Sequence, residues 1–189
     1  NGGASEKIFG KLSFLGRFAM RIGIISDSHG NTNAIDQAVK AAGEIDFWLH
    51  AGDLINDAEY LRMAYDAEVV NVAGNCDWGY HGAEDEELVT AAGSKIFLTH
   101  GHLYGVKSNP ANFLLAVREK GANIGVFGHT HVAFIKKING ILLINPGSLS
   151  YPRDGKGQSF MVLELAEGKE PEIYHYHLQK QNESMYMTL

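Results

Sequence analysis

The sequence predicts an α/β domain, and two observations carry that prediction. In the first half of the chain, short apolar runs rich in β-branched residues alternate with segments of helical periodicity, which indicates parallel strands joined by helices. In the second half the connections shorten, and Asn139 and Gly140 between two apolar runs are typical of an antiparallel hairpin. The chain has 189 residues, enough for one globular unit with a sizeable core.

The first half follows the order strand, helix, strand, helix, strand. Arg21–Ser26 has the β-branched composition of a strand buried on both faces. Thr32–Ala42 carries apolar residues at helical spacing and is followed by Gly43, a common helix stop. The next predicted strand, helix and strand are Ile45–His50, Ala58–Asp66 and Glu68–Val72. This order implies a parallel sheet with right-handed crossovers.

The second half predicts one further helix and seven strands. Asn109–Lys120 has the clearest helical pattern, with Phe113, Leu114 and Val117 on one face. The strands expected around it are Glu87–Thr90, Lys95–Thr99, Ile124–Phe127, Val132–Ile138, Ile141–Asn145, Ser159–Leu165 and Glu172–Leu178.

The two ends of the chain differ from the middle. Residues 1–19 are predicted to be an N-terminal extension, because Met20 resembles a natural start, and a signal peptide is disfavoured by the Gly16 and Arg17 that interrupt its apolar part. Residues 20–178 form the predicted domain, and the weakly patterned residues 179–189 form a C-terminal tail.

The composition narrows the class of partner. The formal net charge of -6 arises without long runs of like charge, so we expect no long nucleic acid to bind. No apolar run approaches the ~20 residues that a membrane-spanning helix needs. Cys76 is the single cysteine, which rules out an internal disulfide and fits a reducing compartment. We therefore expect a cytoplasmic protein with no membrane partner.

Potential metal ligands follow the ends of the predicted strands. Pairs two residues apart send both side chains to the same side of an extended chain. Ligands in open α/β sheets bind outside the carboxyl ends of the strands, so these residues should converge on one rim. They are Asp27, His29, Asp53, Asn75, His100, His129 and His131.

The chemistry of this set indicates transition metals. Nitrogen and oxygen donors without thiolate favour Mn, Fe, Zn, Co or Ni over Ca or a structural Cys-based zinc site. Seven ligands exceed the needs of one tetrahedral ion, whereas two ions sharing a carboxylate would use them economically. Two ions ~3.5–4 Å apart clamp the attacking and leaving oxygens of a displacement at phosphorus. The sequence therefore predicts phosphoester hydrolysis.

The motifs SDSHGN, GD, GNCD, HGH and GHTH, with NPGS at Asn145–Ser148, resemble the calcineurin-like metallophosphoesterase superfamily. Within it they are similar to the small bacterial and archaeal phosphodiesterase branch. The resemblance covers Met20 to about Leu178 and implies a four-layer α/β/β/α sandwich of two mixed β-sheets. It also implies a dinuclear phosphodiesterase, with manganese as the expected ion, that hydrolyses small phosphodiesters by in-line attack of a metal-bound hydroxide.

The ligand sets that the resemblance implies share one residue. One ion would be held by Asp27, His29, Asp53 and His131, and the other by Asp53, Asn75, His100 and His129. Asp53 would bridge the two ions. Asp77 matches a position that supports a loop or orients a neighbouring residue.

Three further residues are candidates for the catalytic site beside Asn75. Many larger members of the superfamily have a histidine where this chain has Cys76, and a thiol is a weak donor at neutral pH. The alternative is that Cys76 fills a tight turn. His102 is a candidate proton donor or phosphate contact. Arg153 is a candidate bidentate phosphate ligand, with a solvated loop residue as the alternative.

Other functions of the same superfamily remain open from the sequence. A non-catalytic protein-interaction scaffold of this fold keeps a degraded ligand set, whereas all seven ligands are present here. A nuclease would need a nucleic-acid surface that this acidic chain lacks. A phosphomonoesterase is disfavoured by the residue after Asn75. We also expect self-association into a dimer or tetramer.

Overall fold

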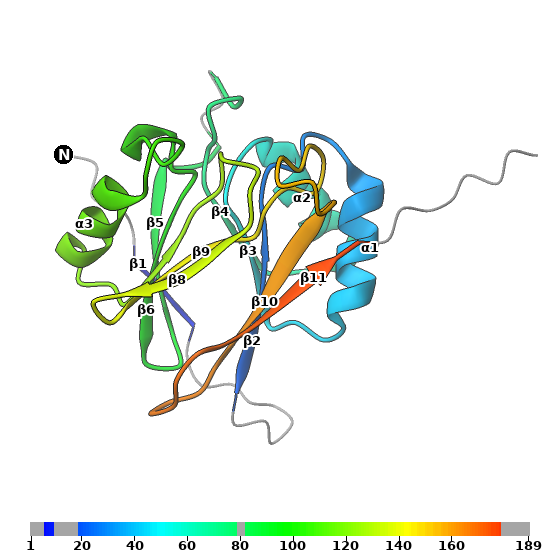
Figure 1. The fold of residues 1–189 in the computed structure, drawn as a ribbon. Coiled ribbons are helices and arrows are strands. Elements are labelled where there is room, and N and C mark those ends of the chain that lie inside the picture. The colour runs from blue at the N-terminus through cyan, green and yellow to red at the C-terminus, as the bar shows by residue number, and fades with distance from the viewer. Residues whose placement is uncertain (1–5, 10–18, 79–81, 179–189) are drawn as a thin grey trace, which may run out of the picture.

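Two β-sheets pack face to face, with helices on both outer faces, in the computed structural model of the chain (Figure 1). The structure describes residues 6–9, 19–78 and 82–178. The α/β/β/α sandwich expected from the sequence is confirmed. The predicted tail 179–189 and most of the extension 1–19 lie outside the described residues.

The first sheet contains the βαβαβ unit, and its strand order is β11-β10-β2-β3-β4. Strands β2, β3 and β4 are parallel, as predicted, while β10 pairs antiparallel with both β2 and β11. The elements are β2 (Met20–Ile25), α1 (Thr32–Ala42), β3 (Phe47–His50), α2 (Ile55–Tyr65), β4 (Val69–Asn71), β10 (Ser159–Leu165) and β11 (Glu172–His177).

The second sheet has the strand order β1-β5-β6-β7-β9-β8. Strands β6, β7 and β9 are parallel, and β8 returns antiparallel to β9 through the predicted Asn139 and Gly140 turn. The elements are β1 (Glu6–Phe9), β5 (Glu86–Ala91), β6 (Ser94–Thr99), the short 3-10 helix η1 (His102–Tyr104), α3 (Ala111–Glu119), β7 (Ile124–Val126), β8 (Phe134–Ile138) and β9 (Ile141–Asn145).

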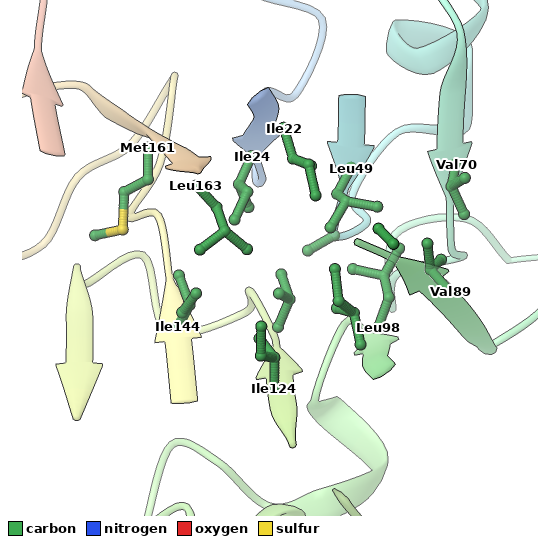
Figure 2. Close-up of a cluster of buried hydrophobic side chains, with 14 of the residues drawn as sticks. Ile22, Ile24, Leu49, Val70, Val89, Leu98, Ile124, Ile144, Met161 and Leu163 are labelled. Atoms are coloured by element: carbon green, nitrogen blue, oxygen red, sulfur yellow. The ribbon is translucent and has the colours of Figure 1, made fainter. Parts of the chain in front are cut away.

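The main core lies between the two sheets (Figure 2). Ile24 and Leu49 from one sheet meet Leu98, Ile124 and Ile144 from the other, and all five are fully buried. Burial of each such side chain stabilises the fold by about 1.5–3 kcal/mol. The inner faces of both sheets therefore hold the strand ends in fixed relative positions.

Each helix covers the outside of its sheet. Helix α1 buries Ile35 and Ala38 against the first sheet, and α3 buries Phe113 and Val117 against the second. The side chain of Asn31 caps α1 by accepting the Ala34 N–H. No helix in the described part of the chain is long and apolar enough to cross a membrane.

The main differences from the sequence prediction lie in three elements, and one of them, the short helix η1, was not predicted. Strand β1 was not predicted either, and it adds a parallel edge strand beside β5, with the Phe9 ring stacked 4.0 Å from Phe47. Helix α2 begins at Ile55 and not at Ala58, because Asp77 accepts the Ile55 N–H at 2.9 Å. A residue from a later loop thus caps this helix.

Candidate metal centre

The candidate centre lies where strand ends from both sheets meet. Asp27 and His29 follow β2, and Asp53 follows β3 of the same sheet, whereas His100 and His129 follow β6 and β7 of the other sheet. The His129 N–H donates to Asp27 Oδ2 at 3.0 Å, so the sheets are joined at the centre itself. The single rim expected from the sequence is therefore shared by two sheets.

The backbone at the centre is unusual. Five of the seven predicted ligands have φ angles in the left-handed region, between 46° and 65°, and they are Asp27, His29, Asp53, His129 and His131. For residues with a Cβ this conformation costs about 1–2 kcal/mol each. Such strain persists only where surrounding contacts hold it, and it is typical of functional sites.

Two glycines allow the strand ends to approach one another. A Cβ added at Gly74 would lie 2.1 Å from Asp53 Oδ1, and one added at Gly128 would lie 1.9 Å from Ser26 Oγ. Neither distance is compatible with a side chain. These positions require glycine because of close approach to a neighbouring segment.

The first group of donor atoms surrounds Asp27. Ligand atoms of Asp27, His29, Asp53 and His131 all lie within 4.8 Å of one another. The distance from Asp27 Oδ1 to His131 Nε2 is 3.1 Å, and that from Asp53 Oδ2 to His29 Nε2 is 3.6 Å. The carboxylates are buried, and the His29 side chain is only partly exposed.

The second group surrounds His100 Nε2. This atom lies 3.4 Å from Asp53 Oδ1, 3.2 Å from Asn75 Oδ1 and 3.2 Å from His129 Nδ1. Donors that share an ion with bonds of about 2.0–2.2 Å lie roughly 3.0–3.6 Å apart. The spacing in both groups fits a coordinated cation.

Hydrogen bonds to main-chain carbonyls orient two of the histidine rings. His100 Nδ1 lies 2.7 Å from the Ala51 carbonyl oxygen, and His131 Nδ1 lies 2.8 Å from that of Tyr151. A carbonyl only accepts, so each Nδ1 carries the proton, and Nε2 of the neutral ring presents a lone pair. These lone pairs face the lone pairs of carboxylate and amide oxygens, which repel them. A cation bound between them removes that repulsion.

Two buried atoms of the first group have no hydrogen-bond partner among the described residues: Asp27 Oδ1 and His29 Nε2. Buried polar atoms are normally satisfied, and an ion is one accepted explanation of an exception. The residues present therefore fit a metal ion on grounds of spacing, ring orientation and unsatisfied atoms together.

The electrostatics of the rings follow from burial and from the neighbouring charges. Burial, with His100 and Lys107 nearby, lowers the pKa of His129 to about 4, so the ring is neutral at pH 7. The Asp27 carboxylate, whose Oδ1 lies 3.1 Å from His131 Nε2, raises the pKa of His131. Burial opposes ionisation of Asp27, but His131, His100 and the Ser26 hydroxyl together outweigh it, and the pKa of Asp27 is lowered. A positive charge between Asp27 and His131 is thus favoured, whether proton or metal.

Cys76 lies against the shared carboxylate. Its N–H donates to Asp53 Oδ1 at 3.0 Å, and its Sγ lies 3.4 Å from Asp53 Oδ2. Burial and the charge of Asp53 raise the pKa of the thiol to about 11. Cys76 is therefore a neutral thiol in contact with Asp53.

His102 and Arg153 lie on different sides of the centre. The His102 ring lies 5.4 Å from His100 and 6.0 Å from His129 between centroids, and its buried Nδ1 has no hydrogen-bond partner among the described residues. Arg153 is exposed, and its N–H donates to the His131 carbonyl. Its charge opposes protonation of the His131 ring.

Two residues at the centre, Ser148 and Lys107, had no assigned role in the sequence prediction. Ser148, in the NPGS motif, donates through Oγ to the Asp27 carbonyl at 2.8 Å, which explains why this motif accompanies the ligands. Lys107 contributes positive charge near His129. Asp77 holds both the Ile55 and Gly74 N–H groups, in agreement with a loop-supporting role.

Comparison with known proteins places this arrangement in a family. A model of the calcineurin-like phosphoesterase superfamily domain matches residues 20–168. The probable metallophosphoesterase YsnB of Bacillus subtilis is 39% identical over 147 residues, which are 77% of this chain and 85% of that protein. Phosphodiesterase YfcE of Escherichia coli is 28% identical over an alignment of 172 residues that covers 77% of this chain and 88% of that protein.

Solved structures agree with the fold. The structure of Yfce, a phosphoesterase from E. coli, matches with a TM-score of 0.60 and 26% identity, covering 76% of this chain and 88% of that one. A Vps29 double mutant from Entamoeba histolytica matches with a TM-score of 0.70 and 27% identity, covering 85% and 94%. Together with the paired Asp and His groups at the strand ends, these matches show that the chain belongs to the calcineurin-like phosphoesterase superfamily.

Proposed function

We propose that the protein is a phosphodiesterase that uses two divalent transition metal ions, with manganese as the expected ion, to hydrolyse small phosphodiesters. The similarity to a protein named a phosphodiesterase supports the reaction class. The donor set of imidazole, carboxylate and amide groups supports the metal class.

One observation carries the proposal: the two oxygens of Asp53 face different groups. Oδ2 lies 3.6 Å from His29 Nε2 in the first group, and Oδ1 lies 3.4 Å from His100 Nε2 in the second. A carboxylate with one oxygen toward each group is suited to bridge two ions. Asp27, His29 and His131 would complete one site, and Asn75, His100 and His129 the other.

The ions would lower the pKa of a bound water and neutralise charge on the phosphoryl oxygens. The protein supplies the rest. Asp27 and Asp53 are anionic donors held in place by the His129 and Cys76 N–H groups. The Ala51 carbonyl keeps His100 Nε2 directed at the centre.

His102 is our candidate for contact with the substrate. Burial lowers the pKa of its ring, so it is neutral at pH 7 and still carries one N–H to donate. Cys76 remains protonated and contributes little general-acid assistance. This pairing favours esters whose leaving group requires little protonation, such as aryl diesters.

Two cations flank the centre and favour an anionic substrate. Arg153 lies on the His131 side and Lys107 on the His129 side, and both are exposed. Their charge offsets the net charge of -6 of the whole chain only locally. A small phosphodiester fits this pattern better than a long nucleic acid.

The test is an activity panel on metal-free protein reloaded with Mn²⁺, using an aryl phosphodiester, an aryl phosphomonoester, a cyclic nucleotide and single-stranded DNA. We expect the aryl diester to be hydrolysed fastest, and the rate to disappear with chelator and in Asp53→Asn. Asp36→Asn, a carboxylate on α1 that accepts from Tyr60 and Tyr65, is the matched control and should retain the rate. Full metal occupancy without hydrolysis of any ester would instead favour the non-catalytic scaffold.

A further inference from the structure

A buried chain of hydrogen bonds lies directly behind the first group of donors. His50, the last residue of β3, is fully buried, as is Ser28, and Asp57 in the first turn of α2 is 3% exposed. Ser28 Oγ lies 2.9 Å from His50 Nε2 and 2.6 Å from Asp57 Oδ2. Each of these side chains belongs to a different segment of the chain.

The direction of every bond in this chain is determined. The Gly52 N–H donates to His50 Nδ1 at 3.2 Å, so Nδ1 has a lone pair and the proton of the neutral ring is on Nε2. His50 Nε2–H therefore donates to Ser28 Oγ. The Ser28 hydroxyl proton is then directed to Asp57 Oδ2, which also accepts the Gly30 N–H at 2.8 Å.

These hydrogen bonds connect the backbone segments that carry ligands of the first group. Ser28 stands between Asp27 and His29, and Gly52 directly precedes Asp53. All three of these candidate ligands have left-handed φ angles, a conformation that surrounding contacts must enforce. The bonds to Ser28 and Gly52 hold the two strained segments in a fixed relation to each other.

We propose that Ser28, His50 and Asp57 are positioning residues that set the affinity of the first metal site, made by Asp27, His29, Asp53 and His131, more than that of the second, which shares only Asp53 with it. This rests on the proposed function, since it assigns a role toward the same ions. The second group is oriented by other contacts: the Ala51 carbonyl fixes His100. The chain of hydrogen bonds ends at the buried Asp57. It therefore holds the ligand segments in position and does not transfer protons to solvent.

Two single substitutions, used as starting proteins (backgrounds) for further variants, allow metal binding at each site to be measured separately. His129→Ala leaves the first group intact, and His131→Ala leaves the second group intact. In each background we would measure the Mn²⁺ dissociation constant by equilibrium dialysis of the metal-free protein. Loss of a residue that orients a ligand costs about 10–100-fold in metal affinity. Ser28→Ala should show that loss with H129A and stay within about threefold with H131A.

Conservative and control variants distinguish hydrogen bonding from general damage. Asp57→Asn keeps an oxygen that accepts from Ser28 and Gly30, so it should bind Mn²⁺ within about threefold of its background, whereas Asp57→Ala should weaken the first site about 10–100-fold. Ser159→Ala removes another buried serine hydroxyl, which donates to the Pro146 carbonyl, and should leave both constants unchanged. Circular dichroism confirms that each variant is folded.

The outcomes separate this inference from the proposed function. If neither background binds Mn²⁺, both the proposed function and the inference are overturned. If Mn²⁺ binds but Ser28→Ala and Asp57→Ala leave the first constant unchanged, or weaken both sites equally, only the inference is overturned. A conservative D57N that behaves like D57A would equally contradict the hydrogen-bonding role.

A measurement without any variant provides a second test. Long-range ¹H–¹⁵N correlation spectra of the metal-free protein report which ring nitrogen of a histidine carries the proton. We expect His50 as the neutral Nε2–H tautomer, which the Gly52 N–H requires. A neutral Nδ1–H tautomer would break the chain at Gly52 and overturn the inference.

Discussion

At the scale of single residues, the centre depends on side chains whose roles are set by which atom faces which neighbour. Asp53 combines a left-handed backbone, an oxygen toward each donor group and two contacts from Cys76. His100 and His129 bring ring nitrogens within 3.2 Å of each other, a separation that a shared cation stabilises. Changes at these residues should therefore alter the two sites in different ways.

Asp53→Ala should remove both ions together, because each group loses one of its carboxylate oxygens. Asp27→Ala should mainly empty the first site, since Asp27 belongs to that group alone. Metal content per protein after dialysis measures both effects. Asp36→Ala on α1 is the control and should keep both ions. One ion fully retained in D53A would contradict the bridging role.

Cys76→His should raise hydrolysis of alkyl diesters and monoesters far more than that of aryl diesters. A well-placed general acid contributes about 10²–10⁴-fold, and the thiol, with its pKa raised to about 11 by burial and Asp53, supplies little of it. The change is measured by plotting hydrolysis rates of a series of esters against the basicity of their leaving groups. Cys76→Ala with metals in place should keep aryl diester rates within about threefold, and a collapse would show that the thiol takes part in the chemistry.

At the scale of elements, contacts connect the end of helix α3 to strand β5, in the sheet that carries His100 and His129 of the second group. Lys120, after the last turn of α3, forms an ion pair with Glu86 on β5 at 2.8 Å, and the Tyr104 hydroxyl of η1 also donates to Glu86. Lys120 lies 5.4 Å from the Phe97 ring centroid. These contacts join the loop that carries His102 and Lys107 to the sheet.

Glu86→Gln should flatten the fall in stability at acid pH. Partial burial opposes ionisation of Glu86, but the bonds from Lys120 and Tyr104 outweigh it and lower its pKa below the ordinary 4.5. A lowered carboxyl pKa gives stability that is present above pH 4.5 and is lost as pH falls through the folded pKa. Urea unfolding of metal-free protein between pH 7 and 3 measures it. Glu170→Gln, from the exposed Lys137 pair, should leave the profile unchanged.

At the scale of the whole molecule, the geometry of the centre depends on how the two sheets pack against each other, because each sheet carries part of the ligand set. Strand β1 contributes to this packing although it carries none of the candidate ligands. Its Phe9 ring stacks on Phe47 of the opposite sheet, and Lys7 pairs with the buried Glu87 at 2.8 Å. A homo-oligomer and a cytoplasmic location stay predictions from the sequence.

Phe9→Ala should lower the free energy of unfolding by about 1–3 kcal/mol, less than the 3–5 kcal/mol of a fully buried aromatic, because Phe9 is only half-buried. Ile8→Ala on the same strand is the matched control. Ile8 is 72% exposed, so its loss should change stability by less than about 0.5 kcal/mol. Equal effects of the two substitutions in urea titrations would contradict the placement of β1 against the core.

The sequence by itself determined the order of the three α-helices and of strands β2 to β11, and the identity of the clustered polar residues. Helix α1 begins and ends where its pattern predicted, at Thr32 and Ala42, because burial of one helix face imposes a local period on the chain. The predicted ligands converge because each lies within a few residues of the end of a buried strand, and the parallel strands of each sheet deliver their carboxyl ends to the same side.

Only the tertiary structure decided how those residues are used. Strand β1 pairs with β5, about 80 residues later, and α2 is capped by Asp77, so neither has a local signal in the sequence. The carbonyls of Ala51 and Tyr151 fix the protons of His100 and His131. Every residue has a backbone carbonyl, so the pattern of side chains in the sequence does not indicate which carbonyl a histidine ring will contact. That contact follows from the packing of distant segments.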